Sequence, residues 1–225
     1  MPRKIAPGVF LVGGEGFSDP SDCLCYGLDL GAPVLIDCGA FPGSWTAIRK
    51  NLRQVGLAAD QLHSLVLTHA HIDHAGAAAR VVAETGCRVV AHALDADTLE
   101  RGDRLRSAAD WYQTELAPVR VDQKIQGEGE SLAFPGGVLH LVHTPGHTPG
   151  SMCAWLEVDE GGTRQRVLFG QDVHGPFHPA FGSDREAHRA SLRKLLALEA
   201  DVLCEGHLGV FHGQDAVREF IEGYL

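Results

Sequence analysis

The sequence lacks any segment that would place the chain in or across a membrane. No window approaches the ~20 consecutive apolar residues that a spanning helix needs. The basic start, Met1–Gly8, is not followed by the apolar stretch of a secretory signal. These absences predict a cytoplasmic protein without a membrane partner.

Basic residues are also scarce, with 19 Lys and Arg against 29 Asp and Glu, so that the formal net charge is -10. Proteins that bind nucleic acid normally carry a basic surface, and the short stretch Arg101–Arg106 is mixed with acid. We therefore expect a small-molecule substrate and no nucleic-acid partner. The 6 cysteines form no CxxC pair, which predicts buried, reduced thiols without a redox role.

What remains is the composition of an ordinary globular protein, with 44% hydrophobic and 21% charged residues. No repeat or low-complexity linker divides the chain, so we expect one α/β domain over residues 1–225. Apolar runs bounded by glycine or proline predict strands, and apolar residues at helical spacing predict helices. The expected strands are 9–12, 23–30, 34–37, 64–68, 88–91, 139–143, 151–158, 166–169 and 202–204. The expected helices are 44–55, 75–85, 186–198 and 214–224.

The segment 95–116 differs from the rest of the chain because it is charged and contains Trp111 and Tyr112. It has no strand of its own, and its pattern predicts a helix. Three interpretations stay open: a lid, a face that forms a homodimer, or a solvated surface helix, which is the commonest case.

Ligand-type side chains follow the predicted strands at several places, and the densest group has four within six positions directly after strand 64–68. In an α/β domain, loops beyond strand ends are where a rigid scaffold presents functional groups. Imidazole and carboxylate suit zinc, iron and manganese. Any one of these histidines alone would be read as an ordinary loop residue. Together they predict a metal centre made of His69, His71, Asp73, His74, His147, Asp172 and His207.

The spacing of these residues resembles a known family. The run from His69 to His74 matches the HxHxDH motif of the metallo-β-lactamase-fold hydrolase superfamily, and Thr144–Thr148 matches its later histidine element. The resemblance covers essentially the whole chain and implies a four-layer αββα sandwich. It implies that one metal ion is held by His69, His71 and His147, the other by Asp73, His74 and His207, with Asp172 as the bridge. Asp37 matches an aspartate that supports the ligands.

The implied cofactors are two divalent metal ions, zinc first, with iron or manganese as alternatives. Two ions ~3.5–4 Å apart can share a water, lower its pKa and let the bridging hydroxide attack a carbonyl. Asp73 is the predicted catalytic residue because it both ligates and orients that hydroxide. His174 and His178 are predicted either to line the substrate cavity or to be ordinary loop histidines.

The predicted function is hydrolysis of an ester, thioester or lactone. Asp172 at the bridging position counts against a native β-lactam hydrolase. The chain ends 18 residues after His207 (225 minus 207), without the helical extension with which glyoxalase II binds glutathione. The alternatives are a phosphodiesterase or β-lactam hydrolase on the same site, a single-iron persulfide dioxygenase, and a non-catalytic metal-binding module.

Overall fold

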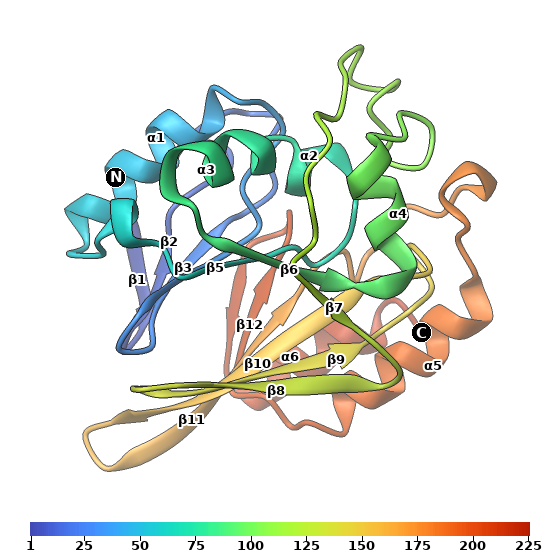
Figure 1. Ribbon diagram of the computed structural model, residues 1–225. Coiled ribbons are helices and arrows are strands. Elements are labelled where there is room, and N and C mark those ends of the chain that lie inside the picture. The colour runs from blue at the N-terminus through green and yellow to red at the C-terminus, as the bar shows by residue number, and fades with distance from the viewer.

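A computed structural model describes residues 1–225 and shows two β-sheets packed face to face, with helices on both outer faces (Figure 1). The first sheet has seven strands in the order of the chain. They are β1 (Arg3–Ala6), β2 (Val9–Leu11), β3 (Tyr26–Asp29), β4 (Pro33–Ile36), β5 (Ser64–Val66), β6 (Arg88–His92) and β7 (Gln123–Ile125).

The second sheet has six strands in the order β13-β12-β11-β10-β9-β8. Its strands are β8 (Gly129–Phe134), β9 (Gly137–His143), β10 (Met152–Glu160), β11 (Thr163–Gly170), β12 (Val202–Glu205) and β13 (Val210–His212). The helices are α1 (Ser44–Gln54), α2 (Ile72–Ala75), α3 (Ala78–Thr85), α4 (Ala93–Arg101), α5 (Arg185–Leu196) and α6 (Gln214–Glu222), with short 3-10 turns η1 (Ala59–Gln61) and η2 (Pro179–Phe181).

The crossovers of the first sheet explain why its helices lie on one outer face. Strands β4, β5, β6 and β7 pair in parallel, so each connection must return over the sheet. Helix α1 buries Trp45, Ile48 and Leu52 on one side, the stripe with which a helix packs on a sheet. Helix α3 stops at Gly86, whose φ of 67° is the left-handed conformation that favours glycine after a helix.

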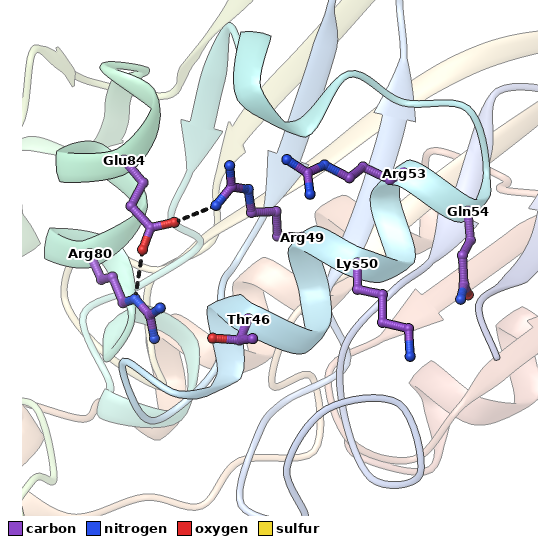
Figure 2. A pocket seen from close by; sticks show the side chains of 7 residues that line it. All are labelled: Thr46, Arg49, Lys50, Arg53, Gln54, Arg80 and Glu84. Carbon is purple, nitrogen blue, oxygen red and sulfur yellow. Dashed lines mark hydrogen bonds and ion pairs between the residues drawn. The ribbon is translucent and has the colours of Figure 1, made fainter.

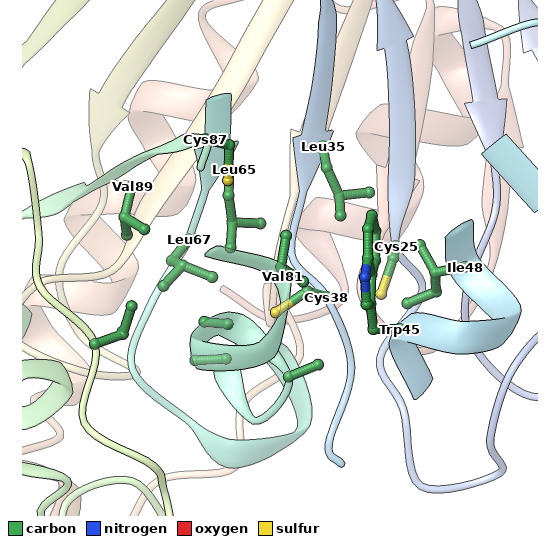
Figure 3. Close-up of a cluster of buried hydrophobic side chains, with 14 of the residues drawn as sticks. Cys25, Leu35, Cys38, Trp45, Ile48, Leu65, Leu67, Val81, Cys87 and Val89 are labelled. Atoms are coloured by element: carbon green, nitrogen blue, oxygen red, sulfur yellow. The ribbon is translucent and has the colours of Figure 1, made fainter. Parts of the chain in front are cut away.

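Three apolar clusters separate the four layers. The first lies between the first sheet and helices α1 and α3, where Trp45 packs among Cys25, Leu35 and Ile48 (Figure 3). The second fills the space between the two sheets, and the third packs the second sheet against α5 and α6. The predicted αββα sandwich is thereby confirmed.

A network of charged side chains ties α1 to α3 on the outer surface. Glu84 accepts hydrogen bonds from Arg49 Nη1 at 3.0 Å and from Arg80 Nε at 2.9 Å (Figure 2). It also accepts one from Trp45 Nε1 at 2.9 Å. A hollow of about 500 Å³ lies here, and no hydrophobic residue lines it. In Figure 2 Lys50 points away from Arg53, so these side chains converge on no common point. This hollow is a salt-bridged helix surface.

The strand and helix predictions were accurate where apolar periodicity is strong, but four strands, β1, β7, β8 and β13, were not predicted, and one long predicted helix is largely wrong. Of residues 95–116, only the part within α4 is helical, and the chain from Asp103 to Leu116 consists mainly of turns. Gly102, with φ of 64°, ends the helix. No helix in the structure has both the length and the hydropathy required to traverse a bilayer.

Candidate metal centre

All seven predicted ligands lie together at the ends of strands from both sheets. His69 and His71 follow β5, and Asp73 and His74 lie in the short helix α2 directly after them. The other three come from the loops after β9, β11 and β12: His147, Asp172 and His207. Six of the seven are buried, and His207 has 29% of its side chain exposed.

The first group of donor atoms comes from His69, His71, His147 and Asp172, whose ligand atoms all lie within 4.8 Å of one another. His147 Nε2 is 2.8 Å from His71 Nδ1. Oδ2 of Asp172 is 3.1 Å from His147 Nε2 and 3.8 Å from His69 Nε2. Three imidazoles and one carboxylate oxygen therefore surround one point.

The second group comes from Asp73, His74 and His207. Nε2 of His74 lies 3.3 Å from Nε2 of His207, and Asp73 Oδ2 is 3.3 Å from the latter atom. Oδ1 of Asp172 is 3.2 Å from His74 Nε2 and 3.3 Å from His207 Nε2. Asp172 thus presents one oxygen to each group and lies between them, as a bridging ligand would.

Unpartnered buried atoms test whether this donor set fits metal ions. His69 Nε2, His71 Nε2 and Asp172 Oδ1 are buried and have no hydrogen-bond partner. An unsatisfied buried polar group is costly, and natural proteins rarely keep one without a role. Two ligands at ~2.05 Å on a tetrahedral ion stand about 3.3 Å apart, which is the separation of the His74 and His207 nitrogens. The histidines and aspartates are positioned to bind metal ions.

The protonation preferences differ between the two groups. Burial, together with the neighbouring imidazole of His147, lowers the pKa of His71 from 6.5 to about 3. Burial also opposes protonation of His207, but Asp172 and Asp73 outweigh it and raise the pKa of His207 to about 10. The second group is therefore the one with excess negative charge, and it attracts a cation, whether a proton or a metal.

Asp37 supports the second group by a hydrogen bond to His74, as the sequence resemblance implied. Its Oδ2 accepts from His74 Nδ1 at 2.8 Å and from Thr68 Oγ1 at 2.8 Å, and its Oδ1 accepts from the Thr68 N–H at 2.9 Å. Because an ionised carboxylate only accepts, Nδ1 of His74 carries a proton, which leaves Nε2 as the atom that would bind a metal. Asp37 and Asp172 both have positive φ, 56° and 54°, which places strained backbone at the site.

Asp95 is a supporting residue that the sequence did not reveal. It is buried in α4 and accepts from the Ala70 N–H at 3.0 Å, the Gly150 N–H at 2.8 Å and Thr148 Oγ1 at 2.8 Å. One carboxylate therefore joins the loop of His69 and His71 to the loop of His147. An acidic residue in a charged helix gives no sequence signal for this role.

Aromatic rings form one wall of the site. The Phe181 ring packs against His71, with centroids 4.4 Å apart, and against Trp111 at 4.8 Å. Trp111 is 56% exposed and also contacts His178. The Tyr112 hydroxyl lies near Asp73, and burial together with that carboxylate raises its pKa. The segment with Trp111 and Tyr112 therefore borders the centre.

A small cavity of about 110 Å³ continues from this wall beside Ala70 and Thr148. Its lining includes Leu94, Phe181 and one cation, Arg106. Phe177 does not line this cavity, because its ring packs against His188 at 4.7 Å and beneath Arg185.

His174 and His178, for which the sequence left two roles open, have different contacts in the structure. His178 caps the 3-10 turn η2 by accepting from the Ala180 N–H at 3.1 Å. His174 hydrogen-bonds Glu205 at 2.8 Å, and its ring faces that of His207 with centroids 5.3 Å apart. Glu205, fully buried at the end of β12, was not recognised from the sequence, because one glutamate after an apolar strand carries no motif.

Comparison with known proteins agrees with this geometry. The family profile described as the metallo-beta-lactamase superfamily matches residues 19–207. The "probable metallo-hydrolase YflN" of Bacillus subtilis is 28% identical over 199 residues, 77% of this chain and 74% of the relative. An N-acyl homoserine lactonase of a Bacillus species is 25% identical, covering 75% of this chain and 62% of the relative. A hydroxyacylglutathione hydrolase of Rhodospirillum rubrum is 28% identical, covering 75% and 58%.

Among solved structures, BJP-1, a subclass B3 metallo-beta-lactamase of Bradyrhizobium japonicum, superimposes with a TM-score of 0.75. It is 26% identical, and the match covers 92% of this chain and 77% of that one.

Proposed function

Since this chain belongs to the metallo-beta-lactamase superfamily, we propose that it is a dinuclear metal-dependent hydrolase that acts on an ester, thioester or lactone carbonyl. The observation that carries the proposal is the placement of Asp172, whose two oxygens face two separate groups of buried donor atoms. Zinc is the metal we propose, because nitrogen and oxygen donors at tetrahedral spacing suit it.

The metal ions, when bound, supply Lewis acidity and lower the pKa of a coordinated water. The chain's own residues set the geometry around that chemistry. Burial would raise the pKa of Asp73, but His74 and the hydrogen bond with His207 outweigh it and lower the pKa. The Asp73 carboxylate is therefore ionised at neutral pH. It can accept a hydrogen bond from the attacking water, and it thereby orients that water and takes up its proton.

The wall of the site supports an acyl substrate of low charge. Phe181 and Trp111 offer aromatic surface next to His71, and the adjoining cavity has a single cation. The cavity itself is of mixed polarity, since only 4 of its 11 lining residues are hydrophobic, but its one cation is matched by Asp95. A site without an excess of cations suits an acyl group of low charge better than a polyanion. The lactonase among the relatives agrees with this choice, whereas the hydroxyacylglutathione hydrolase makes the glutathione thioester the competing substrate to test.

The test is a set of kcat/KM values for lactones, simple esters, simple thioesters, a glutathione thioester, a β-lactam and a phosphodiester. We expect the best lactone or simple ester to exceed the last three. An Asp172→Ala variant should lose the activity. The control is Asp201→Asn, which should keep it, because the Asp201 carboxylate lies away from the centre and accepts a hydrogen bond from the Arg166 N–H at 2.8 Å. A glutathione thioester or phosphodiester that wins by tenfold, about 1.4 kcal/mol, refutes the substrate assignment. Activity that survives Asp172→Ala refutes the site.

A further inference from the structure

Glu205 is a buried carboxylate with no Lys or Arg partner, and the proposed chemistry does not use it. Its side chain has no exposed surface. Burying a carboxylate is costly unless hydrogen bonds replace its water, and an apolar residue would often give a more stable fold. Its presence therefore needs a reason other than stability.

The hydrogen bonds of Glu205 lead directly to the second donor group. Oε2 accepts from the backbone N–H of His207 at 2.7 Å and of Leu208 at 2.8 Å. Oε1 accepts from Nδ1 of His174 at 2.8 Å. One carboxylate thus fixes the turn that carries a predicted ligand and also the orientation of a second imidazole.

The turn has little freedom on its other side. A Cβ on Gly206 would lie 2.8 Å from Oδ1 of Asp172 and 2.3 Å from Oε1 of Gln171, so the backbone of the turn packs directly on the bridging aspartate. A shift of the turn would move His207 relative to Asp172, and their ligand atoms are only 3.3 Å apart.

His174 lies beside the second donor group, with its ring between those of His207 and Tyr224, whose centroids are 5.3 and 6.4 Å away. With Nδ1 donating to Glu205, its Nε2 is left as an acceptor. That atom has no hydrogen-bond partner within the protein and is accessible to solvent, and the side chain is 22% exposed. Beside it lies His207, the most exposed of the predicted ligands.

We propose that Glu205 is a positioning residue that holds His207 for the second metal ion through the backbone of its turn, and that aims Nε2 of His174 at the substrate. The substrate part rests on the proposed function. His174 then accepts a hydrogen bond from an O–H or N–H group of the substrate on the His207 side of the centre.

Two substitutions at Glu205 separate the two roles. Glu205→Ala removes every acceptor. Glu205→Gln keeps one oxygen for the two backbone N–H groups but turns its NH2 towards His174, which must then carry its proton on Nε2. Metal affinity is measured on metal-free protein with Zn²⁺ alone, in competition with a chromophoric chelator. Kinetics use the best substrate of the panel above.

We expect Glu205→Ala to lower the affinity for the second zinc equivalent 10–100-fold, the usual range for residues that support metal ligands. The affinity for the first equivalent should stay within about threefold of the wild-type value. Glu205→Gln should still bind both zinc equivalents and should raise KM about as much as His174→Ala does. The double variant Glu205→Gln/His174→Ala should have a KM no higher than that of either single variant. Asp201→Ala is the matched control, a carboxylate that also accepts a backbone N–H but lies away from the centre.

Four results would overturn one part or the other of this inference. The positioning role is refuted if Glu205→Ala binds two zinc equivalents as wild type does, or if Asp201→Ala loses zinc equally. If Glu205→Ala does not fold, the KM values of Glu205→Gln and His174→Ala decide, and wild-type KM in both refutes the His174 contact. A wild-type protein inactive on the whole panel refutes the proposed function and that contact with it, while the zinc measurement still decides the role of Glu205.

Discussion

Replacing Asp37 by Asn should weaken metal binding without unfolding the protein. Asn tolerates the positive φ of 56° at this position better than most residues do. It also keeps the size of the side chain and one acceptor for the Thr68 N–H, whose nitrogen lies 2.9 Å from Oδ1 of Asp37 in the wild-type protein. What it loses is the second acceptor, which holds the proton of His74 on Nδ1.

The magnitude follows from that lost acceptor. The amide NH2 of Asn faces His74 Nδ1, so the favourable tautomer of His74 becomes the one with its proton on Nε2, the atom 3.2 Å from Asp172. When a metal is bound to Nε2, the one proton of His74 must sit on Nδ1, where the Asn offers it a donor in place of an acceptor. Partners of metal-bound histidines are usually worth 10–100-fold in affinity, about 1.4–2.8 kcal/mol.

Zinc affinity measured by chelator competition on metal-free protein is the assay, with urea unfolding of the same samples as the check on folding. Asp201→Asn is the control, since it removes one charge from a carboxylate that also accepts a backbone N–H. If Asp37→Asn binds both zinc equivalents with wild-type affinity, then Asp37 does not set the tautomer of His74 and this reasoning is refuted.

Three further predictions concern catalysis, pH and the aromatic wall. Asp73→Ala should lower kcat by orders of magnitude and shift the unfolding midpoint only modestly, and a variant that retains most activity would exclude Asp73 from the mechanism. In metal-free protein the pKa of His207 is raised from 6.5 to about 10, so its stabilisation is complete below pH 6.5 and is lost as pH rises towards 10. Urea unfolding should therefore give a lower free energy near pH 8.5 than near pH 6.5, and a His207→Gln variant should lack that part of the fall. Trp111→Ala should raise KM for long acyl chains several-fold more than for short ones, and equal effects would show that Trp111 does not touch the chain.

Much of the fold was predictable because its signals are local. The apolar runs that became β5, β10 and β11 are continuous and bounded by glycine or polar residues, and α1 shows its buried stripe directly in the sequence. Strands β1, β7, β8 and β13 were missed. Strand β8 illustrates why, since its residues are mostly exposed and it is held by pairing with β9. Such a strand depends on a partner elsewhere in the chain and has no pattern of its own.

The cluster of histidines and aspartates was predictable in part for the same reason, because four of its members lie within six positions, while His147, Asp172 and His207 were found from their place after strands and from the family resemblance. Their supports were not, since these come from distant elements. Asp95 reaches Gly150 across 55 positions, and Glu205 reaches His174 across 31. Each is an ordinary acidic residue in the sequence and acquires its role only when the two sheets bring strand ends together.

The most direct test of the account is the number of metal ions that the protein binds. Elemental analysis of gently purified protein, and of metal-free protein reloaded with zinc and dialysed, should give about two ions per chain. The Asp172→Ala variant should give fewer, because both donor groups lose an oxygen. A reproducible content of one ion or less in the wild-type protein would contradict the dinuclear centre and favour a single-metal enzyme.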